Sequence, residues 1–172
     1  MGRCFSRLAF AATVVALASV SPATAGDQSV ERGKYLVELG GCVHCHTPGY
    51  FLGKPDITRR LAGGDVGFYV PDLGTFYGPN LTPNKETGLG RWTAAQIVTA
   101  LTSGKRPDGR VLAPIMPWGS FAQLTRSDAR AIALYLQSLP PVNNRAPGPF
   151  GPNEPPTSFA MKVLPADAVL AK

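Results

Sequence analysis

The sequence predicts a mostly α-helical protein of about three to five helices with long loops rich in glycine and proline. Three segments carry apolar residues at helical spacing, at 30–39, 94–103 and 126–139. Between the first two lie 46 residues, 47–92, with nine glycines and five prolines and no sustained helical or strand period. A loop of this length is uncommon in a compact domain unless something besides secondary structure organises it.

Helix boundaries follow from capping residues and helix breakers. Ser29 is expected to cap the first helix, 30–39, which a glycine pair then ends. Thr93 and Gln96 have the spacing of a capping box at the start of the second helix. Gly104 is expected to end that helix.

The last helix is expected to start after Thr125, in a sequence similar to a second capping box, and to end at Pro140. Seven prolines among the 17 residues 140–156 exclude a helix or a central strand there. We expect this tail to lie extended, either covering its own domain or docking a partner. A short hairpin is expected around 67–70.

Two cysteines and a histidine form the most specific motif of the chain, Cys42-Val43-His44-Cys45-His46. Two thiols at this spacing, with a histidine directly after the second, are typical of covalent haem attachment. Each cysteine can add to one vinyl group of the porphyrin, and a tight turn presents both sulfurs along one edge of it. We therefore expect one covalent haem c held by Cys42 and Cys45, with His46 as a ligand of its iron.

Three other interpretations compete for this motif. A thioredoxin-like redox pair needs a strand before the first cysteine, whereas the segment before Cys42 is expected to be helical. A structural zinc site needs four ligands, and no cysteine or histidine follows His46. A disulfide between Cys42 and Cys45 would close too small a loop to stabilise the fold much.

The first 25 residues have the pattern of an export signal. Arg3 and Arg7 precede an apolar run, 8–20, and small residues then lead to Ala25, after which we expect cleavage. A retained membrane anchor is the alternative, although the run is short for a bilayer span. The expected parts are a signal peptide at 1–25, a haem-binding domain at 26–141 and a proline-rich C-terminal extension at 142–172.

The charge balance is mildly basic. The formal net charge is +6, and removal of Arg3 and Arg7 with the signal leaves +4. Lysines and arginines are scattered rather than clustered, so we expect no nucleic-acid binding. Contact with a membrane is expected only through partners or through a retained signal segment.

A second axial ligand of the iron must come from few candidates. A low-spin electron carrier needs methionine or histidine on the second side of the haem. His44 lies too close to the attachment site, and Met1 leaves with the signal, so Met116 and Met161 remain. Met116 stands between two prolines that can hold its thioether still, although it could also fill a gap in the core.

Several motifs together resemble bacterial class I c-type cytochromes, and more closely the cytochrome subunits of periplasmic alcohol, aldehyde and sugar-acid dehydrogenases. The resemblance covers roughly 30–141. Besides the haem motif it rests on the segments Asn80-Leu81-Thr82-Pro83, Gly88-Leu89-Gly90-Arg91-Trp92-Thr93, Arg106-Pro107-Asp108-Gly109-Arg110 and Met116-Pro117, and on the closing helix.

This resemblance implies a cytochrome c fold around one covalent haem, with His46 and Met116 as the axial iron ligands. The first and last helices would cross beside the haem. Small residues at Gly33, Ala129 and Ala133 would permit a close crossing. Candidates to meet the haem propionates are Arg91, Trp92 and Arg110.

The expected function is single-electron transfer without bond chemistry, so we expect no enzymatic activity. The resemblance implies a periplasmic mono-haem cytochrome, reduced by a dehydrogenase and oxidised by a terminal oxidase or another cytochrome. A fixed electron-transfer subunit of a dehydrogenase complex is the main alternative. A haem enzyme or gas sensor would need an open iron site, which a Met116 ligand would fill.

Overall fold

A computed structural model describes Met1 and residues 25–163. Residues 2–24, nearly all of the expected signal peptide, and 164–172 lie outside the described residues. The described residues form α1 (Ala25–Leu39), α2 (Cys42–His46), η1 (Tyr50–Leu52), η2 (Ile57–Arg59), β1 (Val66–Val70), β2 (Gly74–Phe76), α3 (Ala94–Ser103), α4 (Trp118–Phe121), α5 (Arg126–Ser138) and β3 (Phe159–Met161). Helices predominate, as the sequence predicts. None of the helices in this described part is long and apolar enough to cross a membrane.

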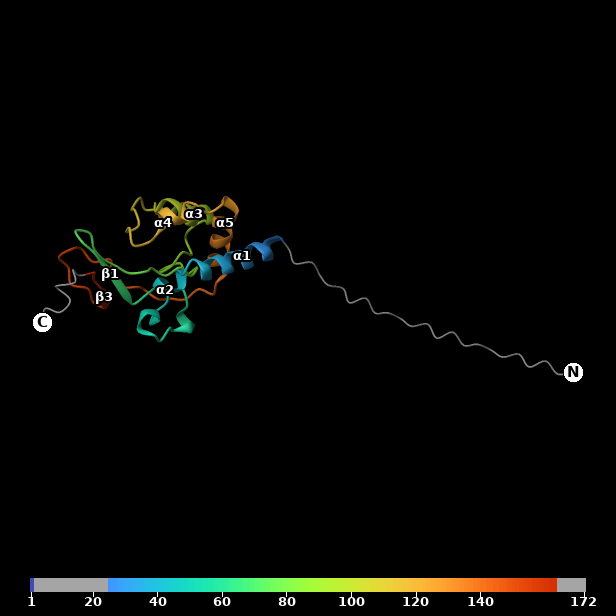
Figure 1. Cartoon of the computed structure of the whole chain (residues 1–172), viewed down its shortest axis with the longest axis horizontal. Coiled ribbons are helices and arrows are strands. Elements are labelled where there is room, and N and C mark those ends of the chain that lie inside the picture. The colour runs from blue at the N-terminus through green and yellow to red at the C-terminus, as the bar shows by residue number, and fades with distance from the viewer. Residues whose placement is uncertain (2–24, 164–172) are drawn as a thin grey trace.

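The elements divide between two ends of the molecule (Figure 1). Helices α3, α4 and α5 gather along one side, and α1 lies beside α5. The three strands lie at the end away from α1, and α2 lies between α1 and the strands. The haem motif therefore sits at the junction of the helical part and the sheet.

Helices α1 and α5 cross in close contact because Gly33 carries no side chain. A β-carbon at Gly33 would lie 2.0 Å from the carbonyl oxygen of Ala131. Ala129 and Ala133 are also buried in α5, so the predicted crossing through small residues is confirmed. The crossing belongs to a core cluster formed by Val37, Leu61, Leu89, Ile97, Leu101, Ile132, Ala133, Tyr135 and Leu136.

The start of α1 differs from the expectation. The helix begins at Ala25, so Ser29 lies inside it and the predicted capping role of Ser29 is wrong. Residues 26–28 contain no helix breaker stronger than one glycine, and Asp27 places a negative charge in the first turn, where the helix dipole favours it. A serine that follows such residues need not start a helix.

The other two predicted helix starts are confirmed. Thr93 accepts a hydrogen bond from the backbone of Gln96, whose side chain accepts one from the backbone of Thr93. Gly104 ends α3 in a left-handed conformation, with φ of 72°. Thr125 caps α5 by accepting from the backbone N–H of Asp128, at 3.1 Å.

Hydrogen bonds organise the long glycine-rich segment between α2 and α3. The expected hairpin is present, with β1 antiparallel to β2. Farther along, Leu81 N–H donates to the Leu61 carbonyl at 2.8 Å, and Gly64 N–H donates to the Gly78 carbonyl at 2.9 Å. The segment thus folds back on itself, and Gly64 and Gly78 lie against the backbone of Cys45.

The C-terminal strap, defined here as residues 142–161, lies extended along this same segment, as the sequence predicts. Strand β3 adds to the sheet parallel to β1, which the sequence did not predict. Thr75 and Phe150 exchange two backbone hydrogen bonds, at 2.9 and 3.0 Å. Ser158 donates to the carbonyl of Asp65 and accepts from the Tyr77 hydroxyl. The described tail therefore contacts its own chain along much of its length.

Candidate functional site

The cysteine–histidine motif forms α2, a helix of five residues that starts after Gly41. Gly41 has φ of 65°, a left-handed conformation that glycine adopts without steric cost. Both thiols are free and partly buried. Burial raises the pKa of the Cys42 thiol to about 11 and also raises the pKa of Cys45. A thioredoxin-like pair needs a lowered thiol pKa, so the site does not fit that class.

The imidazole of His46 is buried and fixed in orientation. Its Nδ1 lies 2.7 Å from the carbonyl oxygen of Pro79, so Nδ1 carries the proton and donates it. This tautomer leaves the lone pair of Nε2 for a metal ion. Burial lowers the pKa of His46, and the bond to Pro79 opposes that shift only in part. The ring is therefore neutral, as an iron ligand must be.

Two glycines let neighbouring backbone approach the end of α2. A β-carbon at Gly78 would lie 2.1 Å from the carbonyl oxygen of Cys45, and one at Gly64 would lie 2.2 Å from the same atom. Gly63 N–H donates to the His46 carbonyl at 2.9 Å. The backbone that carries the motif is thus enclosed by a glycine-lined segment.

The structure places the two candidate methionines in different surroundings. Met116 is partly buried and packs against the core cluster that Cys42 also contacts. Met161 is 41 % exposed on β3, beside Phe68 and Tyr69 of the sheet. Of the two methionines, only Met116 is among the residues that pack, like Cys42, against the core cluster.

The loop that carries Met116 is built from short-range bonds. Met116 N–H donates to the Ala113 carbonyl at 3.0 Å, and Trp118 N–H donates to the Met116 carbonyl at 2.8 Å. Helix α4 follows directly. A β-carbon at Gly40, two residues before Cys42, would lie 3.4 Å from the ring of Phe121 in α4 and 3.8 Å from Cys42 Sγ.

Two buried donors near the end of α3 lack partners in the described part of the chain: Nε1 of Trp118 and Nε of Arg106. The Trp118 ring packs on Gly104, where a β-carbon would lie 3.0 Å from it. The guanidinium of Arg106 lies 5.4 Å from the ring centroid of Trp92. Nη2 of Arg106 also lies 3.3 Å from Oδ2 of Asp108, so only its Nε lacks a partner. Buried N–H groups without partners are costly, so each of the two suits an acceptor such as a carboxylate.

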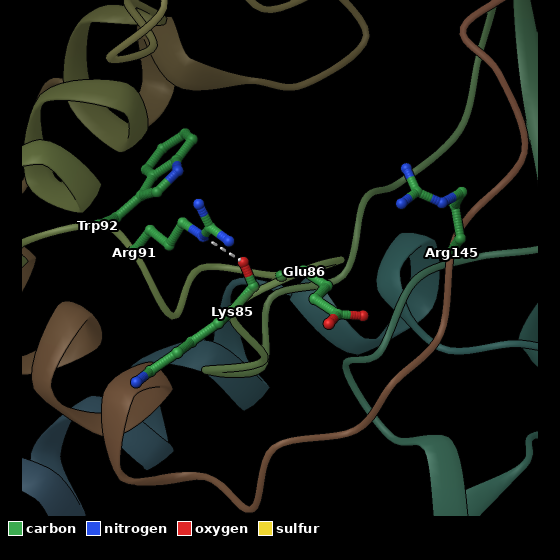
Figure 2. Close-up of a pocket in the computed structure, with 6 residues that line it drawn as sticks. Lys85, Glu86, Arg91, Trp92 and Arg145 are labelled. Atoms are coloured by element: carbon green, nitrogen blue, oxygen red, sulfur yellow. Dashed lines mark hydrogen bonds between the residues drawn. The ribbon is translucent and has the colours of Figure 1, made fainter.

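The three residues predicted to contact the haem propionates, Arg91, Trp92 and Arg110, lie in different surroundings. Arg110 forms two hydrogen bonds with Asp108, at 2.9 and 3.0 Å, and is exposed. Nε of Arg91 donates to the Lys85 carbonyl at 2.8 Å. Figure 2 shows Arg91 and Trp92 on one side of an open hollow and Arg145 of the strap on the other. From the sequence, Arg106 was named only within a motif of the resemblance, and neither Arg106 nor Trp118 was considered as a propionate contact, because no local pattern marks either side chain as buried.

Comparison with family models decides the class of the chain. The model described as cytochrome c matches residues 30–140, well over half of the sequence. The chain belongs to the cytochrome c family. This cytochrome resembles the class I c-type proteins, as its motifs predicted.

Relatives of this cytochrome include subunits of oxidising enzymes. It is 38 % identical over 134 residues to a subunit of the nicotinate dehydrogenase of Pseudomonas putida, an alignment that covers 76 % of this chain and 10 % of that protein. It is 36 % identical over 126 residues to the cytochrome c subunit of a quinone alcohol dehydrogenase of Gluconobacter oxydans, covering 72 % and 24 %. A diheme cytochrome c-type protein of Cereibacter sphaeroides is 33 % identical over 118 residues, covering 69 % and 38 %. The cytochrome thus spans well under half of each of these relatives.

Membership of the family implies a covalent haem c, and the residues present fit one. Cys42 and Cys45 are unpaired thiols within one short helix. His46 offers Nε2, and Met116 offers a thioether beside the apolar cluster against which Cys42 also packs. The unpartnered N–H groups described above could receive carboxylates of the porphyrin. Which of these side chains hold the haem is taken up below as a proposal.

Proposed function

We propose that this protein is a periplasmic mono-haem c-type cytochrome that carries single electrons from a dehydrogenase to an oxidase or another cytochrome. The observation that carries the proposal is the buried imidazole of His46, held by Pro79 at 2.7 Å and adjacent to a free thiol. Haem c, when bound, supplies one-electron chemistry by cycling its iron between two oxidation states. The 172 residues contain one attachment motif, which supports the proposal of one haem.

Different residues of the chain would hold different parts of the haem. Cys42 and Cys45 would form the thioether bonds, and His46 would bind the iron through Nε2. Met116 would bind from the opposite side, where a thioether raises the reduction potential. The N–H groups of Arg106 and Trp118 would donate to the propionates, which removes the cost of burying them without partners.

Electron transfer by a carrier requires little rearrangement of the residues that bind its iron. The ring of His46 is already neutral and oriented, so little rearrangement accompanies electron transfer. With Met116 on the iron, no coordination position would stay open for a substrate or a gas. This distinguishes the proposal from a haem enzyme or sensor, either of which needs a vacant position.

The proposed electron donor is a dehydrogenase, since relatives are subunits of nicotinate and quinone alcohol dehydrogenases. The same observation favours the second candidate, a fixed electron-transfer subunit of such a complex. The two differ in a direct way: a fixed subunit co-purifies with a large dehydrogenase, whereas a free carrier does not. We propose export with cleavage after Ala25, a cytochrome c domain at 26–141 and an extension at 142–172.

Haem staining and optical spectra of cysteine variants test this function. Cys42→Ala and Cys45→Ala should each leave haem attached through one thioether or none, with a large loss of haem-stained protein on denaturing gels. Cys4→Ala is the matched control, because Cys4 lies within the expected signal peptide. Reduced and oxidised spectra of the wild type should be those of a low-spin haem c with histidine and methionine ligands.

Full covalent haem in both single variants would contradict the attachment assignment. Rapid binding of carbon monoxide by the reduced wild-type protein would contradict the Met116 ligand. Either result would also argue against a simple electron carrier.

A further inference from the structure

The C-terminal strap bonds to the same segment that holds His46, and it does so through Asn80. Asn80 is 2 % exposed. Its side-chain amide donates to the carbonyl oxygen of Val142 at 2.7 Å, to that of Asn144 at 3.2 Å and to the hydroxyl of Thr87 at 3.0 Å. The first two acceptors belong to the strap and lie 62 and 64 residues after Asn80 in the sequence.

The carbonyl oxygen of the Asn80 side chain also has hydrogen-bond partners. Its Oδ1 accepts from the backbone N–H of Thr82 at 2.9 Å and from the Thr82 hydroxyl at 2.7 Å. That hydroxyl also accepts from Val142 N–H at 3.1 Å. Asn80 and Thr82 therefore form one buried network with the strap, in which both the donor and the acceptor groups of Asn80 are used.

This network reaches His46 through a single peptide unit. The carbonyl oxygen that accepts from His46 Nδ1 belongs to Pro79, and its peptide bond joins Pro79 to Asn80. Since a peptide unit is planar, fixing the position of Asn80 fixes the direction of the Pro79 carbonyl. The strap is thus bonded to the residue that directly follows the acceptor of the imidazole N–H.

A second connection runs to the backbone of His46. The side chain of Asn144 donates to the Ala62 carbonyl at 2.8 Å. The next residue, Gly63, donates its N–H to the carbonyl of His46 at 2.9 Å. Both the ring and the backbone of His46 are therefore held by segments to which the strap is bonded.

We propose that the strap is part of the support of the proximal iron ligand, and that Asn80 is a positioning residue for it. The inference rests on the proposed role of His46 as that ligand. A strong hydrogen bond from Nδ1 increases the basicity of the ring and stabilises the ferric state. Loosening the strap weakens this bond and shifts the iron toward the ferrous state, so the strap sets the reduction potential.

Two pairs of variants of the full-length haem-loaded protein test this inference. Thr82→Val removes the hydroxyl that links Asn80 to Val142 at nearly constant volume, whereas Thr82→Ser keeps it. Asn144→Ala removes the bond to Ala62, and Asn143→Ala changes the adjacent, exposed asparagine of the same strap. The readouts are the reduction potential, the NMR signal and solvent exchange of His46 Nδ1–H, and the melting temperature.

Thr82→Val and Asn144→Ala should raise the ratio of ferrous to ferric protein at a fixed potential by roughly threefold to tenfold. Tenfold corresponds to about 59 mV for one electron. The Nδ1–H signal should shift and exchange faster in the same two variants. Thr82→Ser and Asn143→Ala should retain the wild-type potential and Nδ1–H signal.

The inference is overturned if Thr82→Val and Asn144→Ala lower the melting temperature but keep the potential and the Nδ1–H signal of their controls. That result would assign the strap a structural role alone and leave the proposed function intact. By contrast, a wild-type protein without covalent haem, or one whose haem survives His46→Ala unchanged, would overturn the proposed function and this inference together.

Discussion

The two proposed iron ligands are held in opposite ways. His46 is buried, and its bonds reach partners far along the chain: Pro79 at the ring and Gly63 at the backbone. Met116 lies in a loop whose backbone bonds join near neighbours, such as the bond from Met116 N–H to Ala113. Residues on both sides of Met116 are exposed, among them Ile115 at 47 %.

This difference predicts unequal local stability. A segment held by long-range bonds opens only when distant parts of the fold separate, whereas a loop of local turns can open alone. We therefore expect the His46 side to remain ordered under conditions that detach Met116. For an electron carrier this arrangement fixes one ligand by the core of the protein and leaves the other to tune the potential.

The largest expected effect comes from removing His46. His46→Ala should reduce the yield of haem-loaded protein by more than about tenfold, because even the hydrogen-bonding partners of metal ligands matter by 10- to 100-fold in affinity. His44→Ala is the matched control, since His44 is exposed and stacks on Tyr50 with ring centroids 4.4 Å apart. Haem staining and the absorption spectrum measure both. Equal haem loading in the two variants would remove His46 from the site.

The next effect comes from the distal side. Met116→Ala should abolish the sulfur-to-iron charge-transfer band and lower the potential by on the order of 100 mV, part of the roughly 0.8 V that axial ligands span. The covalent haem should remain, because the thioethers and His46 are untouched. Met161→Ala should leave the band and the potential almost unchanged. A band that survives in Met116→Ala and vanishes in Met161→Ala would reverse the assignment.

A pair of glycines tests the packing on the two sides. Gly78→Ala should destabilise the haem-loaded protein by about 1–3 kcal/mol, because its β-carbon would lie 2.1 Å from the carbonyl of Cys45. Gly119→Ala, in α4 beside the Met116 loop, meets nothing within 4 Å and should stay within about 0.5 kcal/mol of the wild type. Chemical denaturation measures the difference. Equal stabilities would show that the enclosure of the motif is not tight.

The smallest expected effect is on the pH at which acid abolishes the charge-transfer band. Hydrogen bonds from Arg110 hold the pKa of Asp108 below its ordinary value of 3.8, so the folded loop favours the carboxylate. Its contribution is complete above the unfolded-state pKa and is lost as the pH falls through the lower folded pKa. When the charge-transfer band is titrated with acid, it should be lost at a higher pH in Asp108→Asn than in the wild type.

Asp56→Asn is the control for the acid prediction. A hydrogen bond from Thr58, together with one from Arg59, lowers the pKa of Asp56 to about 2, but this carboxylate lies in the segment after α2. Its substitution should leave the acid midpoint of the band unchanged. The same midpoint in all three proteins would show that the charges of residues 106–110 do not support the Met116 loop.

Much of the site could be predicted from the sequence because its determinants are local. The spacing of Cys42, Cys45 and His46 is a property of five consecutive residues, and it already indicated covalent haem. The caps of α3 at Thr93 and of α5 at Thr125 depend on side chains that bond within one turn, and both were confirmed. The family match then agreed with the motifs.

The surroundings of those residues depend on tertiary structure. The bond from His46 to Pro79 and the parallel strand β3 join residues that are far apart in the chain. No local pattern specifies such pairs, because their cost in chain entropy is offset only when the whole fold brings them together. Five consecutive residues therefore indicate which group this protein binds, whereas long-range packing determines how firmly each side of the site is held.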